Sequence, residues 1–182
     1  EKKKDLTKLI TSFVKEDDTV SYGGSVSLKE TGVLDFFRSG NYVFLDRDAY
    51  ETREEKDEIY RKSFSADYYF LSASAVTMDG EILNVDGNGN RIAAMIFGPK
   101  KVFVIIGMNK LTADIKEAEE RIRLYAGPMD AKVLSKQTPC TVTGECSDCR
   151  SPERICNKYL VYRREMNPDR MKVILINENL GY

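Results

Sequence analysis

The sequence contains no histidine and no tryptophan among its 182 residues. The absence of histidine excludes a Ser–His or Cys–His catalytic pair, an imidazole base near neutral pH and a histidine metal ligand. Any acid–base chemistry would therefore fall to Asp, Glu, Lys, Tyr or a tuned Cys.

The sequence also lacks an excess of one charge and any long apolar run. Its 28 basic and 29 acidic residues give a net charge of −1, which gives no reason to expect a nucleic acid or an acidic membrane surface as a partner. No apolar run reaches the roughly 18 residues of a membrane span. No apolar core follows the charged start Glu1–Asp5, so no signal peptide is predicted and we expect a cytoplasmic protein. Because the chain opens on Glu1, we expect a native N-terminal segment to be missing.

The length and composition fit one domain over residues 1–182. Short β-branched and aromatic runs alternate with amphipathic stretches, and this alternation predicts an α/β fold with a mainly parallel sheet flanked by helices. Asp79-Gly80 separates two short apolar runs, which predicts a β-hairpin near residues 75–85 with a type I′ turn.

Two amphipathic stretches carry signals for the ends of helices. Ser27 and Glu30 have the spacing of a capping box, which predicts a helix from Ser27 to about Arg38. Residues 114–126 place apolar side chains on one face, and Gly127-Pro128 after them predicts the end of this helix.

Small and polar residues follow three of the predicted strands. They are Gly23, Gly24 and Ser25; Ser72 and Ser74; and Asp86, Gly87, Asn88, Gly89, Asn90 and Arg91. Ligands of such sheets bind beyond the carboxyl ends of the strands, and glycines beside free helix amides favour a small anion. We expect these loops to converge on one ligand; tight turns without a ligand are the alternative. The dinucleotide fingerprint fails because residue 92 is Ile.

All four cysteines lie in residues 138–157, with the spacing C-x5-C-x2-C-x6-C: Cys140, Cys146, Cys149 and Cys156. Clustered cysteines in a cytoplasmic chain favour a metal site, and four thiolates suit zinc and an iron–sulfur cluster equally well. The spacing matches neither the usual zinc ribbon nor a ferredoxin. Disulfides, reduced free thiols and thiol redox chemistry stay as alternatives.

Several of these segments together resemble one known family, the lactate-utilisation (LUD) domain family, in a LutC-like form. They are Tyr22–Ser25, Phe44–Asp46, Arg61–Asp67, Thr77–Met95, Phe97–Val102, the cysteine segment 138–157 and Asn177–Tyr182, so the resemblance extends over nearly the whole chain. It implies a fold like that of ribose-phosphate isomerases, glucosamine-phosphate deaminases and CoA transferases (NagB/RpiA/CoA-transferase-like). It also implies an association with the oxidation of lactate to pyruvate.

A second resemblance bears on catalysis. Residues 72–84 resemble a segment of sugar-phosphate isomerases related to the initiation factor 2B subunits, which carry an acidic residue where Ser74 stands. A proton-shuttling isomerase needs that carboxylate, so its loss argues against isomerase chemistry unless Asp79, Glu81 or Asp86 substitutes for it.

Three functions remain open from the sequence. The one we favour is an accessory protein of lactate utilisation that binds a small anionic molecule, carries a metal on its cysteines and works with other lactate-utilisation subunits. The second is a standalone isomerase-like or CoA-transferase-like enzyme, and the third is a structural or regulatory module. The oligomeric state stays open.

Overall fold

The computed structural model describes residues 2–182, which divide into two compact units. The first unit comprises the chain up to Ser72, Ala93–Met108 and Glu165–Gly181, and the second comprises Ala73–Ile92, Asn109–Arg164 and Tyr182. Within this described part of the chain, no helix is both long and apolar enough to cross a membrane.

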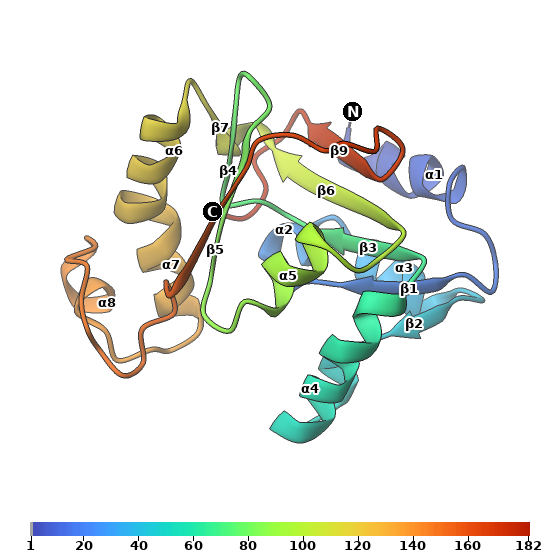
Figure 1. Ribbon diagram of the computed structural model, residues 1–182, viewed down its shortest axis with the longest axis horizontal. Helices are drawn as coiled ribbons and strands as arrows, with labels where there is room; N and C mark the ends of the chain where they lie inside the picture. The colour runs from blue at the N-terminus through green and yellow to red at the C-terminus, as the bar shows by residue number, and fades with distance from the viewer. Residues whose placement is uncertain (1) are drawn as a thin grey trace. The chain divides into compact units, whose positions relative to one another are not determined.

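The first unit is built on a five-stranded sheet with the strand order β2-β1-β3-β6-β9 (Figure 1). All four neighbouring pairs are parallel, which confirms the predicted α/β class with a mainly parallel sheet. The strands are β1 (Thr19–Tyr22), β2 (Val43–Leu45), β3 (Tyr68–Leu71), β6 (Lys101–Gly107) and β9 (Met171–Ile176). The helices are α1 (Leu6–Thr11), α2 (Val26–Glu30), α3 (Val33–Ser39) and α4 (Arg53–Lys62), and α5 (Asn90–Ile96) links the two units along the chain.

The core of the first unit lies between this sheet and helices α1, α2 and α3. Phe70 of β3 and Phe103 of β6 are buried there with their ring centroids 5.1 Å apart, and Phe37 of α3 packs against Phe70. The opposite face of β1 is also covered, since Ser21 Oγ lies 2.6 Å from Ser63 Oγ in the turn after α4. Burial on both faces explains the continuous apolar runs of these strands.

The helix predicted from Ser27 to about Arg38 is interrupted, so that prediction is wrong in two respects. Ser25, rather than Ser27, caps α2 by accepting a hydrogen bond from Leu28 N at 3.2 Å. Gly32 then adopts a left-handed conformation with φ of 72°, which separates α2 from α3. A glycine in this conformation commonly ends a helix.

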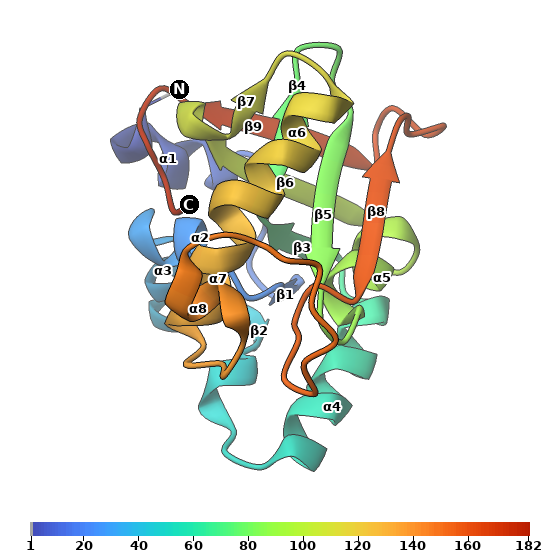
Figure 2. The same cartoon turned by 90° about the vertical axis from the view of Figure 1, so that its left-hand side faces the viewer.

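The second unit contains a four-stranded sheet with the order β7-β4-β5-β8 (Figure 2). Its strands are β4 (Ala75–Thr77), β5 (Ile82–Asp86), β7 (Leu111–Thr112) and β8 (Lys158–Tyr162), and its helices are α6 (Ile115–Arg121), α7 (Gly127–Val133) and α8 (Pro139–Thr143). Helix α6 covers one face of this sheet, where Ala118 packs against Ala75 and Leu83. This face is the core of the second unit.

The predicted hairpin is confirmed, because β4 and β5 pair antiparallel. The turn is not of type I′, since Gly80 has a positive φ of 90° but Asp79 does not. Gly80 N donates to Thr77 O at 3.0 Å, and Thr77 N donates to Glu81 O at 2.9 Å. Three residues, Met78 to Gly80, therefore form the loop, with the glycine in the left-handed position that such loops require.

The helix predicted for residues 114–126 begins as expected, but Gly127-Pro128 does not end it. Asp114 caps α6 by accepting from Glu117 N at 2.8 Å. The chain then passes through a π-helical turn, Ile122–Ala126, directly into α7, which begins at Gly127. Proline is tolerated in the first turn of a helix because its missing N–H would be unpaired there, so Pro128 opens a new helix.

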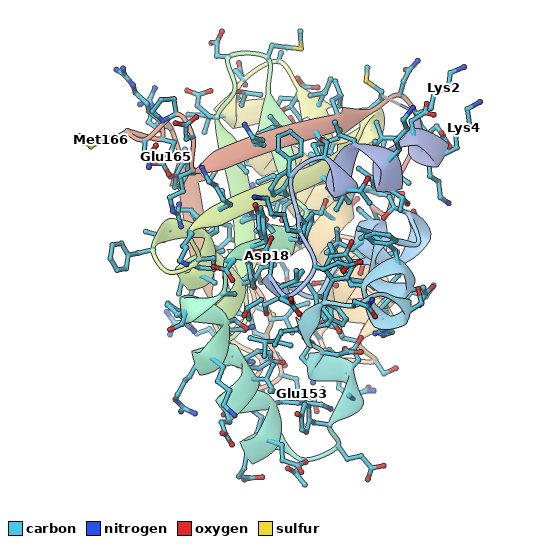
Figure 3. All side chains as sticks on the ribbon, turned by 90° about the vertical axis from the view of Figure 1, so that its right-hand side faces the viewer. Lys2, Lys4, Asp18, Glu153, Glu165 and Met166 are labelled. Atoms are coloured by element: carbon cyan, nitrogen blue, oxygen red, sulfur yellow. The ribbon has the colours of Figure 1, made fainter. Side chains whose placement is uncertain are left out.

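The approach to β9 is fixed by one partly buried arginine of the first unit. Arg170 Nη1 donates to Glu165 Oε2 at 3.0 Å and to Met95 O at 2.9 Å. The neighbouring Met166 is 93% exposed and points away from the ribbon, next to Glu165 (Figure 3). Arg170 therefore holds the turn while Met166 contributes no packing.

We expect Gly32→Ala to lower the free energy of unfolding by about 1–2 kcal/mol, the cost of a left-handed conformation for a residue with a Cβ. No atom lies within 4 Å of the position that the new Cβ would take, so the backbone conformation is the only source of the loss. Gly32→Asn is the matched control, because asparagine tolerates this conformation and should lose less. Urea unfolding measures both, and equal stability of Gly32→Ala and the parent chain would contradict the assignment.

Candidate functional site

The cysteine segment lies within the second unit, between α7 and β8. Cys140 is in the short helix α8. Gly144 ends this helix in a left-handed conformation, and its backbone N–H donates to Cys140 O. Cys146 N donates to Arg123 O at 3.2 Å, which ties the segment to the π-helical turn. Gln137 N donates to Glu153 Oε2 at 2.7 Å, so the start and the later part of the segment are joined.

The four cysteines border one cavity, as the sequence prediction of a common site requires. The cavity has a volume of about 20 Å³ and is lined by Cys140, Cys146, Cys149 and Cys156. Ile122, Pro128, Ala131 and Tyr159 contribute to its walls. An open groove of about 510 Å³ adjoins it and shares Cys149, Arg154, Cys156 and Tyr159 with it. The structure thus brings these residues of the segment together from separate turns of the chain.

Arg154 holds this segment in its folded form. Its Nη1 donates to Cys149 O at 2.6 Å and its Nε donates to Cys156 O at 3.0 Å. Its Nη2 pairs with Asp148 Oδ1 at 2.8 Å. One guanidinium therefore joins the middle of the segment to its end, and the sequence pattern gave no sign of this role.

The cysteines are reduced and partly buried. Burial raises the pKa of the Cys156 thiol, and the nearby Arg154 guanidinium opposes that rise. Asp148 N donates to Cys146 Sγ at 3.4 Å, with Asp148 in a left-handed conformation. Among residues 2–182, no group of three or more His, Cys, Asp or Glu side chains is arranged to hold a single metal ion, and metal binding by the cysteines stays a prediction.

The glycine loop after β5 packs against the end of the cysteine segment. A Cβ on Gly87 would lie 3.3 Å from Ile155 O, and Gly89 has φ of 89°. Lys158 Nζ donates to Gly87 O at 2.7 Å. Close packing and backbone conformation therefore account for both glycines, and a ligand role for this loop, including Asn88 and Asn90, stays a prediction.

The Asp86 carboxylate occupies the start of α5. It accepts from Ile92 N at 3.0 Å and from Arg91 Nε at 2.9 Å, and Asp86 is only 7% exposed. A helix start favours negative charge, and this carboxylate supplies one from the chain itself. An external anion would have to share this position with Asp86.

The three acidic residues suggested as acid or base do not gather at one point. Asp79 and Glu81 lie in the hairpin before β5, whereas Asp86 lies at the opposite end of that strand. Glu81 accepts from Thr77 Oγ1 at 2.5 Å and pairs with Arg163 at 3.2 Å, so it supports the hairpin. A catalytic role for any of the three stays a prediction.

The Gly23–Ser25 loop of the first unit lies beside an arginine that sequence reasoning did not identify. The position of a Cβ on Gly24 is 2.8 Å from Arg47 Nη1, so a side chain at residue 24 would displace this guanidinium. Arg47 also lies over the Tyr60 ring at 5.2 Å. Its buried Nε makes no hydrogen bond and lies 3.5 Å from Asp48 Oδ1, which is an ion-pair contact. A cation therefore stands over a glycine turn at the end of β1.

The two serines predicted as ligand residues are both held by other contacts. Ser72, in the first unit, is 2% exposed and donates from Oγ to Ser27 Oγ at 3.3 Å. Ser74, in the second unit, donates from its backbone N–H to Leu83 O at 3.0 Å, and its carbonyl oxygen accepts from Arg121 Nη1 at 2.6 Å. Their contact with a ligand stays a prediction.

Sequence reasoning also missed two cations of the second unit, the partly buried Arg121 and the buried Lys110. Arg121 donates to Asn109 O and Ser74 O, and its Nη2 is buried without a hydrogen-bond partner. Burial lowers the pKa of Arg121. Lys110 is 5% exposed and donates to Ala73 O at 3.1 Å. Because their contacts are distant in sequence, no local pattern could have separated these two residues from surface charges.

The sequence can now be placed among known proteins. The family model of the LUD domain matches residues 1–176. The chain belongs to the LUD domain family. No curated protein matches the sequence. The LutC-like subtype within the LUD family stays a prediction.

Similar solved structures have low identity to this LUD domain. The crystal structure of eIF2B delta from Chaetomium thermophilum is 17% identical with a TM-score of 0.40, over 63% of this chain and 50% of that chain. Ribose 5 phosphate isomerase A from Neisseria gonorrhoeae is 14% identical with a TM-score of 0.39, over 62% and 54%. A duf162 family protein from Deinococcus radiodurans is 10% identical with a TM-score of 0.36, over 97% and 99%. The LUD chain thus spans about half the length of the first two, and this degree of similarity carries no functional argument.

Asp46, which precedes Arg47 in the sequence, supports a prediction about how the stability of the fold depends on pH. Burial alone would raise the pKa of Asp46, but hydrogen bonds from Arg38 and Tyr22 outweigh burial and lower it. Arg38 Nε lies 2.7 Å and Tyr22 Oη 2.6 Å from the Asp46 carboxylate. A carboxyl whose pKa is lower in the folded chain stabilises the fold above its unfolded pKa of about 4, and this contribution is lost as the pH falls through the folded value.

We therefore expect Asp46→Asn to lower the free energy of unfolding by about 1–3 kcal/mol at neutral pH, the range for hydrogen bonds to a charged group. The difference from the parent chain should shrink as the pH falls below about 4. Asp35→Asn is a control, because Asp35 also contacts Arg38 but its side chain is 79% exposed. A difference independent of pH would contradict the assignment.

Proposed function

We propose that this LUD domain is a cytoplasmic accessory protein of lactate utilisation, the oxidation of L-lactate to pyruvate, and that it carries a metal centre on Cys140, Cys146, Cys149 and Cys156. Family membership supports the pathway. The observation that carries the metal centre is the convergence of all four cysteines on one cavity. In this role the chain would act with other lactate-utilisation subunits.

The donor set supports this proposal on chemical grounds. Four cysteines supply four soft thiolate ligands, which favour zinc or iron–sulfur clusters over magnesium or calcium. Arg154 brings the carbonyl groups of Cys149 and Cys156 onto one guanidinium, so the ligand-bearing turns are held in place by the chain itself. A metal would then bind to a segment whose course is already fixed.

The test is metal analysis of protein purified without oxygen, in the parent chain and in Cys146→Ser. We expect the parent chain to retain zinc or iron and the variant to lose most of it, because one of four ligands is removed. Val142→Ser is the control, since Val142 lies in the same segment but is 90% exposed. Equal metal content in the parent chain and Cys146→Ser, or no metal in either, would refute the metal centre.

A second site, for a small anionic molecule, is supported by Arg47. Its guanidinium lies next to Gly24, in the glycine turn that follows the parallel strand β1. Buried polar groups in native structures normally have a hydrogen-bond partner, whereas Arg47 Nε makes no hydrogen bond and lies 3.5 Å from Asp48 Oδ1. An anion bound over Gly23, Gly24 and Ser25 would supply that partner, and the same pocket would serve the alternative, an isomerase-like or CoA-transferase-like enzyme.

We expect Gly24→Val and Arg47→Met to abolish binding of inorganic phosphate and of L-lactate in calorimetric titrations. Valine would occupy the space of the Arg47 guanidinium, whereas methionine removes its charge. Arg53→Met is the control, because Arg53 pairs with Asp57 on α4 and is 58% exposed. Phosphate and lactate binding that is unchanged in both variants would refute this anion site. Turnover of a sugar phosphate or a CoA thioester by the parent chain would favour the enzymatic alternative.

A further inference from the structure

We propose that the four cysteines ligate one iron–sulfur cluster rather than a single zinc ion, and that Arg154 is the positioning residue that closes the chain around it. This inference rests on the metal centre of the proposed function and specifies its chemistry. It is carried by how the cysteines are spaced, by what else borders the cavity and by the contacts of Arg154.

The spacing of the cysteines suits a cluster. A structural zinc ion needs four ligands gathered on one point, with each sulfur about 2.3 Å from the metal. In residues 2–182 no three His, Cys, Asp or Glu side chains are gathered in that way, yet all four cysteines border the same cavity. A four-iron cluster binds each cysteine through a different iron, so its ligands stand around a space instead of meeting at a point.

The volumes of the cavity and the groove indicate which space a cluster would need. The enclosed part measures about 20 Å³, which is room for about one water molecule. The adjoining groove adds about 510 Å³ and has Cys149 and Cys156 on its border as well. A cluster would need the cavity together with the adjacent part of the groove; Cys149 and Cys156 border both, and Cys140 and Cys146 border the cavity.

The surroundings offer sulfur donors and apolar walls. The side chains that border the cavity include no carboxylate, and the apolar ones are Ile122, Pro128, Ala131, Ile155 and Tyr159. Asp148 N donates to Cys146 Sγ at 3.4 Å. Hydrogen bonds to the ligating sulfurs and a shielding apolar shell are the means by which proteins tune such clusters.

Arg154 fixes the chain next to Cys149 and Cys156 and places a positive charge at the border of the cavity. Its three contacts, to Cys149 O, Cys156 O and Asp148 Oδ1, fix the chain on either side of two ligands. Its side chain is only 21% exposed and borders both the cavity and the groove. A fixed positive charge beside an anionic cluster stabilises the reduced form, which carries one more negative charge.

The experiment uses the full chain, purified without oxygen and reconstituted in parallel with ferrous iron plus sulfide or with zinc alone. We expect iron and acid-labile sulfide in equal amounts, the broad visible absorption of an iron–sulfur cluster, and its loss in Cys146→Ser. Stoichiometric zinc without sulfide would overturn the cluster and leave the metal centre of the proposed function intact. No bound metal under either condition would overturn both.

Arg154→Met and Arg150→Met test the positioning role, because they remove the same charge from the same segment. Arg150 borders the groove and is exposed, whereas Arg154 holds the two cysteine carbonyls. In competition with a chelator, we expect the affinity of Arg154→Met for iron to be about 10–100-fold lower than that of the parent chain. This is the usual effect of losing a residue that orients metal ligands. We also expect its reduction potential to become more negative, with partial recovery in Arg154→Lys. Equal iron retention and equal potential in Arg154→Met and Arg150→Met would overturn this role, and circular dichroism of each variant separates misfolding from loss of the cluster.

Discussion

The pairing of β5 with β8 is the constraint on which the second unit depends. The ladder joins Ile82–Asp86 to Lys158–Tyr162, and Asn157 N continues it with a hydrogen bond to Asp86 O at 3.1 Å. Because Cys156 comes just before this ladder, the end of the cysteine segment is fixed against the end of β5. Gly87 must then be small, since Ile155 O lies 3.3 Å from the position of its Cβ. One antiparallel pairing thus determines the course of two loops that looked independent in the sequence.

The two candidate sites differ in what the protein backbone contributes. In the first unit, the backbone turn at Gly23–Ser25 and the guanidinium of Arg47 offer donors to a negative group. In the second unit, the cysteines offer electron pairs to a metal, and Arg154 binds two carbonyl oxygens and a carboxylate. Each arrangement is complete within its own unit, so the two proposals can fail separately. The Asp86 carboxylate accepts a hydrogen bond from Ile92 N at the start of α5, and its role in ligand binding stays a prediction.

Features that depend on neighbouring residues could be predicted from the sequence. The apolar run of β6, the Asp79-Gly80 hairpin and the clustering of the cysteines are all local patterns, and the structure contains each of them. Boundaries were less predictable, since Gly127-Pro128 can end one helix or begin the next, and the π-helical turn allowed the second outcome. The roles of Arg47 and Arg121 could not be predicted, because a charged residue becomes buried only through contacts with distant parts of the chain.

The order of the strands has a consequence for how the chain is made. β9 is the edge partner of β6, but residues 109–164, most of the second unit, lie between them in the sequence. During synthesis on the ribosome, the strongly apolar β6 therefore emerges well before its neighbour and keeps one open edge until β9 has been made. An unpaired apolar edge invites association with other chains. Early folding of the second unit would bring the chain segments of β6 and β9 closer together. The second unit would then promote the completion of the five-stranded sheet.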